Sequence, residues 1–186
     1  AQVQAQSRAG NAPRDLIGAL AWQPGWDWSL YGPLVSEVLR QPYPLLAANL
    51  ERSEIMAIYQ QRPTLPSGMA TTPAVQDALF ADIRESHCGL LPESQLPAML
   101  AVQQQRDRRM AERLLAAPQP AVLLAGAFHA RKDLGVPLHL ADLGAGQGNA
   151  VLVLAEVGKE VAPGSADYVW YTAAMPVQDH CAKLRR

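Results

Sequence analysis

The chain has 186 residues, of which 49% are hydrophobic and 18% are charged, and its formal net charge is −1 with a pI of about 6.5. This length and composition are typical of one folded domain with a hydrophobic core, and they exclude an intrinsically disordered chain. The near-neutral charge supplies no basic surface for a phosphate backbone, so we expect no nucleic-acid partner. No apolar run approaches the ~20 residues that a membrane-spanning helix needs.

The N-terminal part of the sequence predicts two short helices around an aromatic block. It starts with neither an apolar signal core nor a Met, so we expect any targeting segment to lie outside this sequence. Asp15 is placed to cap a short helix over residues 16–20. Three tryptophans then fall within seven residues, which is more typical of a small core under a loop than of a ligand site: Trp22, Trp26 and Trp28. Apolar spacing predicts the next helix over residues 34–39.

Residues 45–50 form a short apolar run between turn signals, which predicts a strand buried on both faces of a sheet. Asn49, Glu51 and Arg52 are polar groups at the end of this strand, where α/β folds usually build their sites. The proline-rich residues 63–73 are predicted to form a surface loop.

Two longer helices follow this loop. Thr72 and Pro73 together resemble a helix start, with a cap and a proline at the first helical position, and they open a helix over residues 75–87. The second helix is predicted over residues 94–117, where two prolines end it.

After residue 120 the pattern changes to short apolar runs, which predict strands over residues 121–126, 138–140, 150–155 and 168–171. Helices followed by strands with few hairpin signals favour an α/β fold. We therefore predict a single domain over residues 1–186, with a central, mostly parallel sheet and helices packed on it.

Two histidines are candidate functional residues. His87 ends a predicted helix, where the helix dipole favours its charged form, and a helix-capping role is the alternative. His129 follows a predicted strand, at the edge of the sheet where α/β proteins bind ligands, and a buried polar core role is the alternative.

The long helix carries a mixed face. Its members lie three or four residues apart and so share one side of the helix: Met99, Gln103, Arg106 and Met110. A methionine stripe at this spacing is usually core, but an unpaired buried arginine is costly, so this face is a candidate binding surface. Asp107 does not share the direction of Arg106 and is expected to pair elsewhere.

Residues 140–149 contain a glycine-rich motif that resembles the first motif of class I methyltransferases. In that fold a helix follows the glycines, whereas here a predicted strand follows them, so the helix N-terminus that holds the ligand is missing. A flexible hairpin between two strands explains these glycines better.

Three sequence blocks occur here in a combination that one known family shares. They are His87-Cys88-Gly89, the Gln103/Arg106-Asp107 helix, and a segment from Gly126 through His129 to Gly135-Val-Pro137. From Trp22 to Cys181 the chain resembles the ChaN-like haem-binding lipoproteins of Gram-negative iron uptake. It departs from them in lacking an N-terminal strand that ends in a Gly-Glu-x-His-Asp motif, and in reading Gly126-Ala-Phe-His129 where they usually have Gly-Asn-x-His. The resemblance therefore implies a family domain that is incomplete at its N-terminus.

The resemblance implies haem as the cofactor and gives the candidate residues roles. Met99, Met110 and Phe128 would line the face of the ring, with Gln103 beside them, and Arg106 would pair with a propionate. His87 or His129 would ligate iron or hold a propionate. The family uses a tyrosine ligand that cannot be aligned here, and Tyr171 is the next candidate.

The resemblance also implies a place and partners. It predicts a role in haem and iron uptake at the periplasmic face of the outer membrane, with a lipid anchor on the full-length precursor. A haem receptor of the outer membrane or a periplasmic haem carrier would be its partner, and haem binding would form a homodimer. The alternative function is a metal-dependent hydrolase of the related α/β superfamily, which would use His129 with acidic ligands.

Composition alone leaves Cys88 and Cys181 open between two partly buried thiols and a disulfide. In an exported protein, a pair so far apart in sequence would close a disulfide. If the family resemblance holds, we expect the two Cα atoms to lie within about 7 Å of each other.

Overall fold

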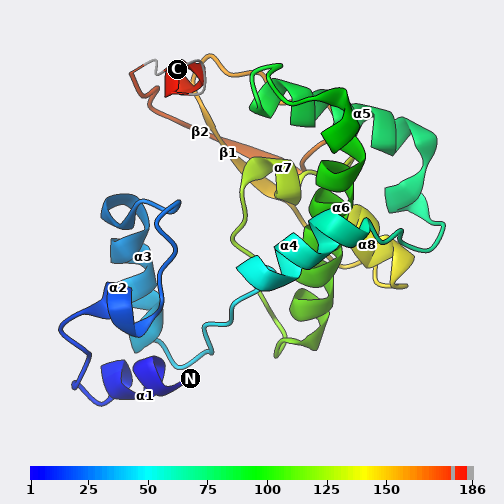
Figure 1. Ribbon diagram of the computed structural model, residues 1–186. Helices are drawn as coiled ribbons and strands as arrows, with labels where there is room; N and C mark the ends of the chain where they lie inside the picture. The colour runs from blue at the N-terminus through cyan, green and yellow to red at the C-terminus, as the bar shows by residue number, and fades with distance from the viewer. Residues whose placement is uncertain (177–178, 184–186) are drawn as a thin grey trace. The chain divides into compact units, whose positions relative to one another are not determined.

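The computed structural model describes residues 1–176 and 179–183. The chain divides into two compact units, Ala1–Ala47 and Ala48–Arg186 (Figure 1). Helices predominate, and the second unit also holds a small parallel sheet, which confirms the predicted α/β class. That residues 1–186 form a single domain stays a prediction.

The first unit is helical, with α1 (Gln2–Arg8), α2 (Leu16–Ala19) and α3 (Trp28–Arg40). The buried Gln4 amide donates to the Tyr43 carbonyl over 2.8 Å and accepts from the Leu45 N–H over 3.1 Å, so it fastens α1 to the segment that follows α3. Asp15 caps α2 by accepting from the Gly18 N–H, as predicted. The tryptophan block packs on itself, with Trp22 and Trp28 edge to face at 5.1 Å between ring centroids.

Helix α6 (Leu96–Ala116) is the central element of the second unit, and three other helices pack against it (Figure 1): α4 (Arg52–Gln61), α5 (Pro73–Ser86) and α8 (Val136–Asp142). The two ends of α6 pack into different hydrophobic clusters. Leu96 and Leu100 pack with Leu79 and Ile83 of α5, whereas the Met110 end packs with residues of α8. Pro73 occupies the first turn of α5, as its sequence predicted.

Short elements complete this unit: the 3₁₀ turns η1 (Met69–Thr71), η2 (Glu93–Gln95) and η3 (His180–Lys183), and the single-turn helix α7 (Ala127–Ala130). The Asp142 carboxylate accepts from the backbone N–H groups of Met69 (2.6 Å) and Ala70 (3.1 Å) at the start of η1. This contact ties the C-terminal end of α8 to a loop more than seventy residues earlier in the chain.

The sheet consists of β1 (Leu152–Glu156) and β2 (Tyr168–Thr172), which run parallel with Leu152 opposite Tyr168 and Leu154 opposite Trp170. The strands predicted at residues 150–155 and 168–171 are therefore confirmed. Val153 and Ala155 of β1 are buried, while the residues of β2 are exposed.

Two predicted strands do not form among the described residues. Residues 45–50 are irregular, and the Leu45 N–H bonds to the side chain of Gln4 instead of to a neighbouring strand. Residues 121–126 keep the alternating burial of a strand, since Leu123 and Ala125 pack on the core and Val122 and Leu124 are exposed. No neighbouring strand pairs with their backbone, so the sheet is smaller than predicted.

Three further differences concern helices and a loop. Residues 138–140, predicted as a strand, lie in α8, because Pro137 in the first helical turn starts a helix and overrides a three-residue alternation. Helix α4 was not predicted; Glu51 and Glu54 form a capping box at its start. The glycine-rich loop joins α8 to β1, so the predicted hairpin between two strands was wrong.

Within the part of the chain that the structure describes, no helix combines the length and the apolar character that crossing a membrane requires.

Candidate functional site

A buried polar cluster lies where α7 meets α6. The His129 Nδ1 lies 2.5 Å from Oδ1 of Asp107, and the Gln103 amide nitrogen lies 3.0 Å from the same His129 Nδ1. That amide also donates to Oδ2 of Asp107 over 3.2 Å. Asp107 is fully buried, whereas the side chain of His129 keeps 19% of its surface exposed. The cluster therefore presents one partly accessible imidazole on a buried carboxylate.

The carboxylate decides which nitrogen of His129 carries a lone pair. A short contact between Nδ1 and an acidic oxygen places the shared proton between them, so Nε2 is the nitrogen left free to accept a proton or bind a metal. Burial raises the pKa of Asp107, and the hydrogen bond from His129 opposes this rise. A carboxylate behind an imidazole holds the ring in one orientation and makes it a stronger ligand.

Arg106 follows Gln103 and precedes Asp107 on α6, and one of its N–H donors lacks an acceptor among the described residues. Its Nε is the buried side-chain nitrogen or oxygen that finds no partner among the described residues. Burial lowers the pKa of Arg106, and the charge of Asp107 partly restores it. A buried guanidinium N–H without an acceptor is costly, so this position suits an anionic ligand group.

The chain that carries His129 is held from both sides. Arg131 donates to both carboxylate oxygens of Asp133, over 2.9 and 2.7 Å, and reaches Asp82 of α5 at 3.5 Å. Gly135 permits the tight turn into α8, because a Cβ at this position would lie 2.1 Å from the carbonyl oxygen of His129. The Arg131–Asp133 pair and Gly135 thus position the backbone of the His129 segment.

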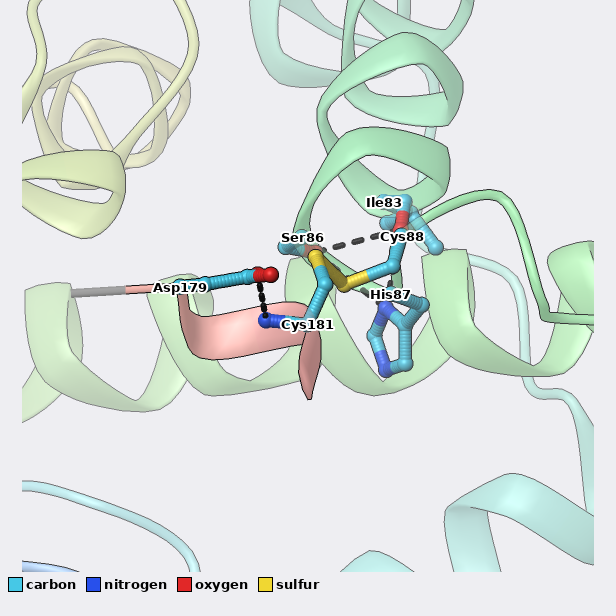
Figure 2. The surroundings of a disulfide bond; sticks show 6 residues. All are labelled: Ile83, Ser86, His87, Cys88, Asp179 and Cys181. Atoms are coloured by element: carbon cyan, nitrogen blue, oxygen red, sulfur yellow. Dashed lines mark hydrogen bonds between the residues drawn. A yellow bond between two sulfur atoms is a disulfide. The ribbon is translucent and has the colours of Figure 1, made fainter. Parts of the chain in front are cut away.

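His87 has a different set of neighbours, at the end of α5 (Figure 2). Its Nδ1 lies 2.8 Å from the Ile83 carbonyl, which can only accept, so Nδ1 donates and Nε2 carries the lone pair. The next residue, Cys88, forms a disulfide with Cys181 of η3, with 5.8 Å between the two Cα atoms. The disulfide expected from the family resemblance is therefore present, and it fastens the C-terminal turn beside His87.

The other predicted site residues lie in different parts of the structure. Gln103 joins the His129 cluster and Arg106 lies next to Asp107 on α6, whereas Met110 is buried in the core with residues of α8. Met99 packs against the core formed by α5 and α6. Tyr171 lies on the exposed strand β2, and no hydrogen bond among the described residues joins His87 or Tyr171 to His129.

Asp107 is the residue that sequence reasoning left out of the site. Its position four residues after Gln103 places both side chains on one side of the helix, which was the available signal. Among residues 1–176 and 179–183, no group of three or more histidine, cysteine or acidic side chains is placed to hold a metal ion.

The sequence pattern of the haem-binding uptake family of the Tiki superfamily, ChaN, matches residues 3–140. The chain belongs to this family. The ChaN resemblance drawn from the three sequence blocks is thus confirmed, and the match includes Gln103, Asp107 and His129.

A solved ChaN structure, described as cofacial haem binding to ChaN of Campylobacter jejuni, matches the chain with a TM-score of 0.79 and 34% sequence identity. The match covers 90% of this chain and 66% of that chain, so this chain spans about two thirds of the length of the Campylobacter protein. No protein with a curated function matches the chain.

Proposed function

We propose that this chain binds haem and serves in haem and iron uptake. Membership of the ChaN family and the similarity to a haem-binding ChaN structure support the proposal. Two observations carry it: the buried Asp107 orients His129, and the neighbouring Arg106 has a buried Nε that lacks a partner among the described residues. One group is suited to iron and the other to a carboxylate, and haem carries both an iron and propionates.

The residues fit this cofactor in distinct ways. Haem supplies an iron that binds an axial ligand and an anionic edge formed by its propionates. Nε2 of His129 is our candidate axial ligand, because Asp107 holds the ring and strengthens the imidazole as a ligand. Arg106 would hold a propionate through its free Nε, and the exposed Phe128 ring would offer an apolar contact. His87, whose Nε2 also carries a lone pair, is the second candidate ligand.

The proposal extends to place and partners. A disulfide is typical of proteins outside the reducing cytosol, so the Cys88–Cys181 bond supports a periplasmic location. We place the protein at the periplasmic face of the outer membrane as a lipoprotein, in exchange with a haem receptor or a periplasmic haem carrier. A homodimer formed on haem binding would shield the apolar ring faces from water.

Titration of the purified protein with hemin tests the proposal, with absorbance as the measurement. We expect a saturable Soret band at a fixed stoichiometry. Hemin that gives only the spectrum seen with an unrelated protein of equal charge would contradict haem binding. Metal-dependent hydrolysis without a Soret band would support the hydrolase alternative instead.

A further inference from the structure

A buried negative charge lies directly behind His129. The side chain of Asp107 has no exposed surface. Its Oδ1 lies 2.5 Å from Nδ1 of His129, and its Oδ2 accepts from the Gln103 amide over 3.2 Å. Because both oxygens face N–H donors, the proton between Oδ1 and Nδ1 is the one that remains when Nε2 binds a metal. The Asp107–His129 pair then carries one negative charge, whichever of the two atoms holds this proton.

Two arginines near this pair in the sequence have other partners. Arg131, two residues after His129, donates to Asp133 over 2.7 Å. Arg106, beside Asp107, is assigned to a propionate in the proposed function, and the propionate balances its charge. A buried charge that lacks a partner is costly. The Asp107–His129 pair therefore favours a positive charge at Nε2.

Haem presents two charge states to such a ligand. With ferric iron, the metal and the porphyrin ring together carry one positive charge, and with ferrous iron they carry none, the propionates apart. An anionic ligand pair therefore balances ferric haem, whereas ferrous haem leaves the buried charge without a partner. Hydrogen bonding behind an axial ligand is also one of the ways in which a protein sets the reduction potential of haem.

We propose that the Asp107–His129 pair makes this site selective for ferric over ferrous haem. The selectivity rests on the proposed function, with His129 as the axial ligand, and adds the oxidation state of the haem that is bound. Asp107 is a positioning residue here, because it acts on the iron only through His129. The Cys88–Cys181 disulfide is typical of oxidising compartments, where the iron of free haem is ferric.

Potentiometric titration of the haem-loaded protein measures this selectivity, with absorbance reporting the reduced fraction. Asp107→Asn keeps an acceptor for Nδ1 but removes the charge, so the ratio of ferric to ferrous affinity should fall about tenfold. The midpoint potential of the variant should therefore lie about 59 mV above that of the wild type. Glu112→Gln is the matched control: it removes a carboxylate of the same helix that pairs with Arg108, and it should leave the midpoint unchanged.

The wild-type protein supplies a second measurement that needs no substitution at a buried position. In anaerobic absorbance titrations it should bind hemin at least tenfold more tightly than haem that is reduced before mixing. Equal affinity for the two states, or the same midpoint potential in the wild type and Asp107→Asn, would overturn the selectivity and leave haem binding intact. Failure to bind haem in either state would instead contradict the proposed function, and the selectivity with it.

Discussion

At the scale of single residues, Asp107 holds the candidate site together. A fully buried carboxylate is expensive, and this one offsets the cost by hydrogen bonding to His129 and Gln103. Because Nδ1 of His129 is hydrogen-bonded to this carboxylate, Nε2 is the nitrogen that remains available to bind a metal. The same helix turn leaves the Arg106 Nε without an acceptor among the described residues, so an anion bound there would complete the cluster.

Replacing Asp107 by asparagine should weaken the ligand without deleting it. The amide oxygen can still accept from Nδ1, but it lacks the negative charge that strengthens the imidazole. We expect the Asp107→Asn variant to bind hemin roughly 10-fold to 100-fold more weakly. Glu112→Gln is the control on the same helix, because its carboxylate pairs with Arg108 away from His129. Equal hemin affinity of wild type and Asp107→Asn would remove Asp107 from the site.

His139 makes the stability of the fold depend on pH. Only 2% of its surface is exposed, and burial lowers its pKa from 6.5 to about 4 against the attraction of Asp142. The unfolded chain therefore binds a proton near pH 6.5, whereas the folded chain resists it until about pH 4. The stabilisation is complete above pH 6.5, is lost as the pH falls towards 4, and amounts to about 3 kcal/mol.

Chemical denaturation at a series of pH values measures this effect. Between about pH 7 and about pH 4, the unfolding free energy of the wild type should fall by about 3 kcal/mol more than that of His139→Gln, which has no proton to bind. If the unfolding free energies of the two proteins changed with pH in parallel, His139 would have the same pKa in the folded and the unfolded chain, which contradicts the prediction.

At the scale of elements, the site depends on how α7 and the turn after it are held against α6. His129 is a residue of a single-turn helix, which has little stability of its own. The Arg131–Asp133 pair, the contact to Asp82 and the close approach at Gly135 fix this segment from outside. The Cys88–Cys181 disulfide plays a similar part for the His87 end of α5.

Substitution of Gly135 by alanine tests this dependence. The new Cβ would lie 2.1 Å from the carbonyl oxygen of His129, which is backbone and cannot rotate aside. We expect a loss of about 1 to 3 kcal/mol in unfolding free energy, together with weaker hemin binding. Gly126→Ala is the matched control, since its Cβ would meet only the His129 ring at an ordinary 3.9 Å. Similar stability of the two variants would mean that the turn relaxes without moving His129.

At the scale of the whole molecule, the long helices and the two strands β1 and β2 followed from the sequence. Their apolar periodicity extends over enough residues to decide the type of element. Residues 121–126 carry an equally clear pattern, yet a strand also needs a partner, which one segment's sequence does not supply. Residues 138–140 were too short a run to outweigh the helix start at Pro137.

The candidate site was predictable in part for a related reason. His129, Gln103 and Arg106 stood out by residue type and spacing. The fold brings His129 of α7 against Gln103 of α6, and Arg106 follows three residues later on the same helix. The partner of Asp107 lies 22 residues away on another element, so the pairing becomes visible only in three dimensions. Met110 matched the pattern equally well, but the packing of α8 assigns it to the core.

Hemin titration of three proteins, the wild type, His129→Ala and His87→Ala, followed by absorbance, tests whether His129 binds the haem iron. If His129 is the axial ligand, its variant should show a shifted Soret maximum or affinity reduced at least tenfold, about 1.4 kcal/mol. His87→Ala should then keep the wild-type spectrum, because its imidazole hydrogen-bonds to Ile83 and makes no hydrogen bond to the Asp107 cluster among the described residues. An unaltered spectrum and affinity for His129→Ala would contradict the account and place the iron elsewhere.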